Sequence, residues 1–162
     1  MKGKYLLLGT NLGNRLQNLK TAEKLLEADG ISILRKSSVY VSEPWGVKEQ
    51  PWFLNRVLEV ETTLTSAELL SRILRIEVKM GRIRKIKWGE RLIDIDILYN
   101  GGEVVNTERL KVPHPEIANR RFTLLPLAEL EADGLDPVKQ KRISQLLDQC
   151  PDNLSCEKLE QK

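Results

Sequence analysis

Sulfur and imidazole side chains are scarce in this sequence of 162 residues, which has two cysteines and a single histidine. Cys150 and Cys156 lie near the C-terminus in a polar stretch, far along the chain from His114. A structural zinc site requires four such ligands at close spacing, so we expect none. The two cysteines are expected to be free thiols in a reducing compartment, which predicts a cytoplasmic protein.

Long apolar segments and a strong excess of charge are also lacking. No apolar run approaches the roughly 20 residues of a membrane-spanning helix. The opening residues 1–9 contain only a short apolar run, which is not expected to act as a signal peptide. Lys and Arg number 26 against 23 Asp and Glu, a net charge of +3. We therefore expect no membrane association and no bulk binding of nucleic acid.

A Walker A motif, G-x-x-x-x-G-K-[ST], occurs nowhere in the chain, which disfavours the common P-loop kinases. The chain does contain Gly9-Thr10-Asn11-Leu12-Gly13 after its first apolar run. Glycine and asparagine favour a tight turn or a helix entry there. The backbone N–H groups of such a turn could face a ligand.

Hydrophobic periodicity predicts one domain over residues 1–150, followed by a polar tail at 151–162 that frays. Strands are expected at 4–8, 31–41, 53–63 and 92–99, and helices at about 14–29 and 65–80. Asn14 is suited to cap the first helix, and Thr65 with Glu68 forms a capping box for the second. The order β-α-β-β-α-β predicts an α+β protein with a ferredoxin-like core. We expect an added hairpin that returns at 103–106, then a C-terminal loop and a short helix at 143–147.

The most informative stretch is residues 81–98, where a run of basic residues precedes two aspartates. The cationic residues are Arg82, Arg84, Lys85, Lys87 and Arg91. Side chains two apart on a strand point to the same face, so Asp94 and Asp96 should project together. The isoleucines that alternate with them should face the core.

Two adjacent carboxylates repel each other unless a cation lies between them. Carboxylate oxygens suit Mg²⁺, which often shares its coordination shell with substrate phosphates. Guanidinium and ammonium groups hold phosphate oxygens, so the stretch contains the parts of a phosphoryl-transfer site. The alternative is a half-exposed edge strand whose acids simply pair with the neighbouring basic loop.

Two further features allow both a functional and a structural interpretation. The loop at 42–52 contains prolines, a glycine and the tryptophans Trp45 and Trp52, which fits a binding lid or a loop that its own aromatics hold down. His114 lies between two prolines and close to Arg109 and Lys111, where it could contact a phosphate or be purely structural.

In these motifs the chain resembles the 6-hydroxymethyl-7,8-dihydropterin pyrophosphokinase family, whose members move a pyrophosphoryl group from ATP to a pterin alcohol in folate biosynthesis. The resemblance extends to about residue 147. Its carriers are Leu8-Gly9-Thr10-Asn11-Leu12-Gly13, Pro44-Trp45-Gly46, Phe53-Leu54-Asn55, Glu77, Gly81-Arg82-Ile83-Arg84-Lys85, Trp88-Gly89, Arg91, Asp94-Ile95-Asp96-Ile97, Val112-Pro113-His114-Pro115, Arg120 and Phe122.

The resemblance implies a Mg²⁺-dependent enzyme with ATP as co-substrate, in which Asp94 and Asp96 hold two Mg²⁺ ions. The residues at the reacting groups would be Arg82, Arg91, Asp94 and Asp96. The pterin would contact Ser42, Glu43, Trp45, Phe53, Asn55, Trp88, Asp94 and Phe122. ATP would contact Glu77, Arg84, Lys85, Arg91, Ile97, Arg109, Leu110, Lys111, His114 and Arg120. These small molecules would be its partners, and the protein would be a monomer.

The sequence departs from the family pattern at a few positions. Phe53 stands where a tyrosine is common, Lys111 where a threonine is usual, and Pro115 where some members have an aromatic. The basic loop is one residue shorter, which leaves open the family position that Lys87 fills. None of these changes touches the aspartate pair.

A second class of function, a ferredoxin-like RNA-binding module, would use the basic loop and the sheet as its platform. It is disfavoured because the chain has only three Trp, three Tyr and two Phe and lacks the RNP1 pattern. Paired acids on a central strand would also repel a phosphate backbone. An inactive scaffold of the same fold is disfavoured by the intact aspartates and arginines.

Overall fold

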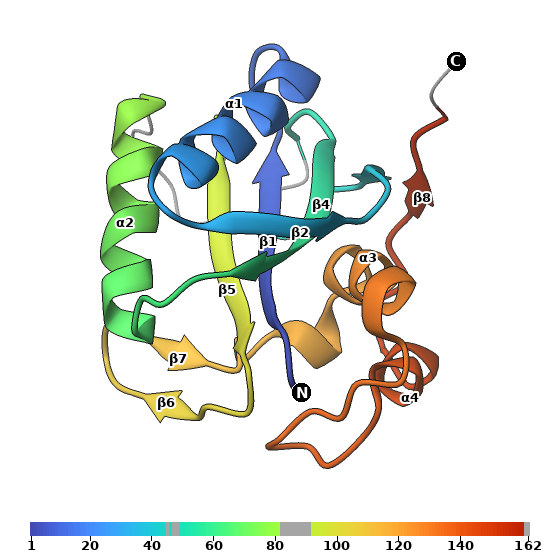
Figure 1. Cartoon of the computed structure of the whole chain (residues 1–162). Coiled ribbons are helices and arrows are strands. Elements are labelled where there is room, and N and C mark those ends of the chain that lie inside the picture. Colours follow the sequence, from blue (N-terminus) through green and yellow to red (C-terminus); the bar gives the residue numbers. More distant parts are fainter. Residues whose placement is uncertain (45, 47–48, 82–91, 161–162) are drawn as a thin grey trace.

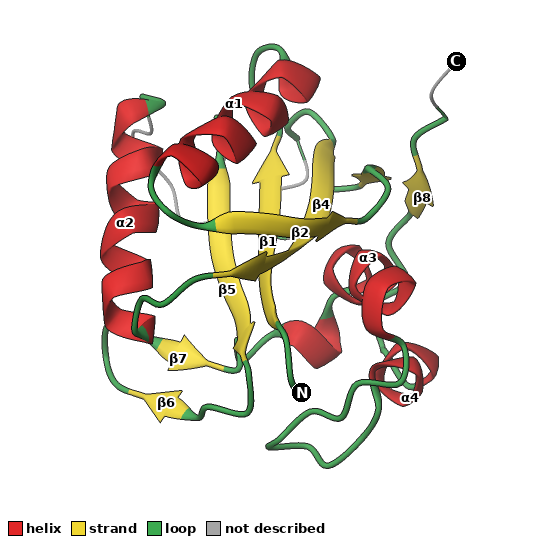
Figure 2. Ribbon diagram, viewed as in Figure 1, coloured by secondary structure: helices red, strands yellow, loops and turns green. Residues whose placement is uncertain are grey.

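The computed structural model describes residues 1–44, 46, 49–81 and 92–160. Their main feature is an antiparallel sheet in which β5, β1, β4, β3 and β8 lie side by side, with β2 pairing with β4 as well (Figure 2). The strands of this sheet are β1 (Lys4–Thr10), β2 (Ser32–Lys36), β3 (Tyr40–Ser42), β4 (Phe53–Glu61), β5 (Asp94–Asn100) and β8 (Cys156–Lys158).

Helices pack on both faces of the sheet (Figure 1). They are α1 (Arg15–Ala28), α2 (Ser66–Lys79), α3 (Arg121–Glu131) and α4 (Ile143–Asp148), with a short 3₁₀ helix η1 (Ile117–Asn119) before α3. Leu6 and Leu8 of β1 are buried with α1 and α2, whereas Leu7 and Val57 are buried with α3 and α4. Because side chains alternate along each strand, the sheet contributes buried residues to two separate hydrophobic cores, one on each face. None of the helices in the described part of the chain combines the length and apolar character needed to cross a bilayer.

The local signals in the sequence produce the expected elements. Asn14 caps α1, because its side chain accepts a hydrogen bond from the Gln17 N–H at 3.1 Å. Thr65 and Glu68 form both bonds of the capping box, at 3.2 and 3.0 Å. The predicted order β-α-β-β-α-β and the α+β class are confirmed, with the strands that follow α1 placed at one side of β4 and β5 at the far side of β1.

The single strand predicted at 31–41 is wrong, because the chain forms β2 and β3 with a break between them. At the break, the Ser37 hydroxyl accepts from the Val57 N–H at 3.0 Å, and the Ser37 N–H donates to the Val57 carbonyl at 2.9 Å. The Arg56 Nε atom donates to the Ser37 carbonyl at 2.9 Å. A side-chain oxygen thus replaces a ladder acceptor and interrupts the strand, while β4 continues past it.

The predicted hairpin is also wrong in its pairing. Residues 103–106 do not return along β5; instead β6 (Val105–Asn106) pairs with β7 (Lys111–Val112) in a separate two-stranded sheet. The Glu103 carboxylate accepts from Ser66 Oγ at 3.0 Å and from Asn100 Nδ2 at 3.1 Å. The bond to Ser66 joins this segment to the start of α2, and the bond to Asn100 joins it to the end of β5.

The expectation of a frayed C-terminus is wrong for the residues that β8 contains. Cys156, Glu157 and Lys158 pair with β3, and the Leu159 N–H donates to the Val39 carbonyl at 2.8 Å. Composition alone marks this stretch as polar, but the outer edge of β3 provides backbone groups with which it pairs.

Candidate active site

Strand register places Asp94 in a row of residues that crosses the sheet, with Asp96 two residues further along the same strand. Asp94 pairs with Gly9 of β1, and Gly9 pairs with Asn55 of β4. Paired residues of an antiparallel sheet project to the same face, which here is the face that carries α3. Asp96 lies on the same face, opposite Leu7. Both acids are half-buried and the isoleucines between and beside them are buried, so their predicted placement on one face is confirmed.

Gly9 is the residue of β1 that lies between Asp94 and Asn55. A Cβ atom on Gly9 would lie 3.2 Å from Asn55 Oδ1 and 3.8 Å from a ring carbon of Phe53. Neighbouring strands are about 4.8 Å apart, so the backbone positions of Asp94 and Asn55 are separated by roughly 10 Å. A flat molecule that lay over Gly9 could reach both side chains.

The predicted pterin residues on β3 and β4 come together beside Gly9. Ser42 pairs with Phe53 across the two strands, and Asn55 Nδ2 donates to Ser42 Oγ at 2.6 Å. Ser42 and Asn55 are buried, whereas Phe53 is half-buried. Phe122 lies in the first turn of α3, which packs against β3 and β4. The structure therefore gathers Ser42, Phe53 and Asn55 directly and brings the start of α3 to the same side of the sheet.

A buried positive charge faces the aspartates from the start of α3. Arg120 is 7% exposed, and its guanidinium carbon lies 5.6 Å from the centre of the Phe122 ring. Burial lowers the pKa of Arg120, while the charge of Asp96, then of Glu116, raises it. A guanidinium nevertheless stays protonated in proteins. Its burial is offset by the nearby carboxylates and by the aromatic face, which makes it a fixed cation beside the aspartate pair.

His114 is held in one tautomer. Its Nδ1 atom accepts from the Glu116 N–H at 3.1 Å, which leaves the proton on Nε2. Its backbone N–H donates to the Leu98 carbonyl at 3.1 Å, at the point where the register of β1 and β5 skips Leu98. Burial, and then the charge of Arg120, lower the pKa of His114 to about 4. The imidazole is therefore neutral at pH 7 and presents one N–H donor.

Glu77 completes the outer edge of β5. Glu77 is only 2% exposed, and its Oε2 atom accepts a hydrogen bond from the Ile95 N–H at 2.9 Å. Ile95 lies between the two aspartates, so this bond from α2 fixes the backbone that carries them. The family resemblance implies that Glu77 contacts the nucleoside. The structure shows in addition that Glu77 accepts a hydrogen bond from the backbone of β5.

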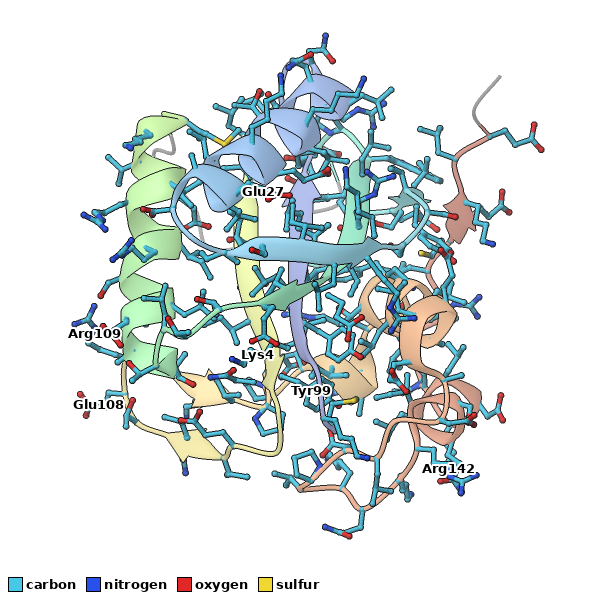
Figure 3. All side chains as sticks on the ribbon, in the orientation of Figure 1. Lys4, Glu27, Tyr99, Glu108, Arg109 and Arg142 are labelled. Carbon is cyan, nitrogen blue, oxygen red and sulfur yellow. The ribbon has the colours of Figure 1, made fainter. Side chains whose placement is uncertain are left out.

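A cavity of about 630 Å³ lies along the same edge of β5, which is a usual size for a small-molecule site. It is lined by Leu70, Leu74, Glu77, Val78, Asp94, Ile95, Asp96, Ile97, Arg109, Leu110, Lys111, His114 and Pro115. Figure 3 shows Arg109 at the left margin of the molecule, beside α2. All described residues predicted for ATP therefore line one cavity, with the exception of Arg120, which approaches the aspartates from α3.

Several predicted residues lie outside the described part of the chain. They are Trp45, Arg82, Arg84, Lys85, Lys87, Trp88 and Arg91. The predicted basic loop thus adds nothing to the described geometry.

Sequence reasoning missed the role of Asn11. Its side chain is 1% exposed, and Nδ2 donates to Gln50 Oε1 and to the Pro51 carbonyl, both at 3.0 Å. Arg15 Nη1 donates to the Trp52 carbonyl at 2.7 Å, while Trp52 itself is 44% exposed. Polar contacts to the backbone therefore fasten this end of the loop. The signal was an asparagine within the Gly9–Gly13 turn.

Asp94 and Asp96 both line the cavity, and Asp94 is also paired with Gly9 on the neighbouring strand. No group of three or more His, Cys, Asp or Glu side chains that could hold a metal occurs among the described residues. Mg²⁺ needs only one or two protein carboxylates, because water and substrate phosphates complete its shell. Asp94 and Asp96 therefore fit Mg²⁺ that is shared with a nucleotide, and the fold and site define an α+β enzyme of the phosphoryl-transfer class.

Comparison with known proteins narrows this class. Residues 5–132 match the model of the 7,8-dihydro-6-hydroxymethylpterin-pyrophosphokinase (HPPK) family. The chain is 44% identical over 142 residues to the 2-amino-4-hydroxy-6-hydroxymethyldihydropteridine pyrophosphokinase of Aquifex aeolicus, covering 87% of this chain and 88% of that one. It is 38% identical over 150 residues to the protein of the same name from Haemophilus influenzae, covering 92% and 93%. The chain therefore belongs to the HPPK family, and the family predicted from the motifs is confirmed.

The fold is also found in a longer protein. The crystal structure of wild-type Plasmodium falciparum HPPK-DHPS superposes with a TM-score of 0.75 at 17% identity, over 91% of this chain. The match covers 44% of the Plasmodium chain, so this protein spans less than half of that molecule. At this identity the likeness supports the fold, in agreement with the predicted α+β architecture.

Proposed function

We propose that this protein transfers the pyrophosphoryl group of ATP to the hydroxymethyl oxygen of 6-hydroxymethyl-7,8-dihydropterin and releases AMP, a step of folate biosynthesis. The observation that carries the proposal is the position of Asp94 and Asp96. They line a cavity of small-molecule size, and Asp94 is paired with Gly9, whose other partner is the predicted pterin residue Asn55. A reaction between two bound molecules requires such a meeting point.

Asp94 and Asp96 are proposed to hold two Mg²⁺ ions in common with the ATP phosphates. When bound, these ions neutralise the charge of the phosphates and orient the attacking oxygen. The support lies in the donor set: two carboxylates on one face of a buried strand, with Glu77 fixing the backbone between them at Ile95.

The remaining described residues supply binding and electrostatics. Arg120 places a buried cation beside the aspartates, where the negatively charged pyrophosphoryl group would be transferred. His114 offers a neutral N–H from Nε2 to a phosphate oxygen in the cavity. Asn55 and Ser42 can read the polar edge of the pterin, with Phe53 and Phe122 as its aromatic contacts. Because no side chain in this set is a strong base, the rate enhancement is expected from positioning and charge neutralisation.

Replacing Asp96 tests this proposal. Asp96→Ala should keep the fold, since Asp96 is only half-buried, and should still bind the pterin. Its AMP release with ATP, Mg²⁺ and hydroxymethyl-dihydropterin should fall by about 100-fold or more, as when a transition-state contact is removed. Asp133→Ala, at an exposed acid after α3, is the control and should retain full turnover. Near wild-type AMP release by Asp96→Ala would refute the metal assignment.

A further inference from the structure

The two walls of the proposed pterin site come from distant parts of the chain. One wall is the end of β3 with Ser42 and the adjoining Glu43, and the other is the start of α3 with Phe122. Residues 151–159, here called the C-terminal strap, contact both walls. Nothing in the proposed reaction so far requires this segment.

At the first wall, the strap is joined to Glu43 and Ser42. Glu43 Oε1 accepts from the Ser155 N–H at 2.7 Å, and the Glu43 N–H donates to the Ser155 carbonyl at 3.0 Å. Cys156 then pairs with Ser42 in the β3–β8 ladder. The side chain of Glu43, a predicted pterin residue, is thus used to hold the strap.

At the second wall, the strap caps a helix that cannot cap itself. The N-cap residue of α3 is Arg120, whose side chain makes no capping bond because arginine has no acceptor atom. Arg121 follows, which places two cations at the positive end of the helix dipole. Asp152 Oδ2 accepts from the Arg121 N–H at 3.0 Å, and Oδ1 accepts from the Leu154 N–H at 2.9 Å. Asp152 therefore supplies from a distance both the acceptor and the negative charge that the helix start lacks.

We propose that the C-terminal strap fixes the distance between the two walls of the pterin site, with Asp152 as a positioning residue. This inference rests on the proposed function. Walls that are held before binding reduce the cost of ordering them around the substrate. The described lining of the ATP cavity includes no strap residue. Loosening the strap should therefore weaken pterin binding more than nucleotide binding, which the strap can affect only through Arg120 at the start of α3.

The experiment compares three variants of the full-length chain with the wild type. Asp152→Ala removes both carboxylate bonds, Asp152→Asn keeps a single acceptor oxygen, and Glu157→Ala changes an exposed residue of β8 whose side chain makes no bond that the structure records. AMP release is measured at varied pterin and at varied ATP. Fluorescence titration with pterin, without ATP, measures binding independently of turnover.

Asp152→Ala should raise both the pterin KM and the pterin dissociation constant by about tenfold, with a smaller change in the KM for ATP, which the strap reaches only through Arg120. Asp152→Asn should lie between it and the wild type, and Glu157→Ala should match the wild type. Equal pterin affinity in Asp152→Ala and Glu157→Ala, or an equal rise in both KM values, would overturn the strap proposal. If Asp152→Ala does not fold, the pterin affinity and both KM values of Asp152→Asn are compared with those of Glu157→Ala, and the same criteria apply.

The two proposals fail in different ways. A wild-type protein that binds no pterin and releases no AMP would overturn the proposed function, and the strap proposal with it. A wild-type protein that does both, with variants that differ only in thermal stability, would overturn the strap proposal alone.

Discussion

Single residues in this site have properties that their neighbours impose. His114 is a neutral donor because Glu116 occupies Nδ1 and because burial opposes its charge. Arg120 is a charged residue that the fold buries, with Phe122 and the aspartates around it. Gly9 has no side chain, and a Cβ atom there would lie only 3.2 Å from Asn55 Oδ1.

Gly9→Ala tests whether the absence of a side chain at this position matters for pterin binding. The added Cβ atom would meet Asn55 Oδ1 at 3.2 Å, so Asn55 must shift by a few tenths of an ångström. Because the methyl group also occupies the proposed pterin position, we expect the pterin KM to rise at least tenfold. The melting temperature should change little. The measurement is steady-state AMP release at varied pterin concentration.

Gly102→Ala is the matched control for this change. A Cβ atom there would meet only the Met1 carbonyl at 3.9 Å, an ordinary contact far from the site. An unchanged pterin KM in Gly9→Ala would show that the substrate does not lie over Gly9.

Secondary-structure elements set the geometry in which these residues meet. β5 is an edge strand whose outer backbone groups are satisfied from other elements: Glu77 of α2 binds Ile95, and the His114 N–H binds Leu98. The same strand therefore carries the aspartates and is anchored to both sides of the cavity. The position of α2 matters to the site through Glu77.

The start of α2 offers a test at this scale. Thr65→Ala removes the hydroxyl that accepts the Glu68 N–H, and we expect the free energy of unfolding to fall by about 1 kcal/mol. Chemical denaturation measures this loss. Thr63→Ala, at an exposed position two residues earlier, should cost less than about 0.5 kcal/mol. Equal stability of the two variants would show that the cap contributes nothing to folding.

The whole molecule places helices on both faces of one sheet (Figure 1). α3 and α4 cover the Leu7–Val57 region, while Gly9, Asn55 and Asp94 lie beyond it along the same strands. The low pKa of His114 is caused mainly by burial, which depends on the fold of the whole molecule.

Acid stability tests this global burial. The pKa of His114 is about 4 in the folded protein and about 6.5 when unfolded, so between these values only the unfolded state binds the proton. Stability should therefore fall as the pH is lowered from 6.5 to 4, with His114 contributing about 3 kcal/mol to the loss. Above pH 6.5 this contribution should be constant.

The contribution is measured by denaturation of the metal-free protein across this pH range, for the wild type and for His114→Gln. Carboxylates also weaken the fold in acid, and subtracting the two curves removes their common effect. The difference between the curves should change with pH over this window. Parallel curves from pH 6.5 to 4 would show that His114 titrates normally in the folded state.

Sequence by itself determined the local structure and the identity of the family. The Asn14 cap and the Thr65–Glu68 box depend on residues three apart, and the alternation around Asp94 and Asp96 depends on residues two apart. Such patterns are visible in the chain because each of their interactions lies within one turn of helix or one step of a strand.

Tertiary structure alone decided which distant residues meet. It split the strand at Ser37, joined Glu103 to Ser66 of α2, and placed Gly9 between Asp94 and Asn55. It also drew the polar C-terminal residues onto β3 and capped α3 with Asp152. Each of these outcomes joins groups that are far apart in sequence, and spacing along the chain does not encode which pairs of groups form such bonds.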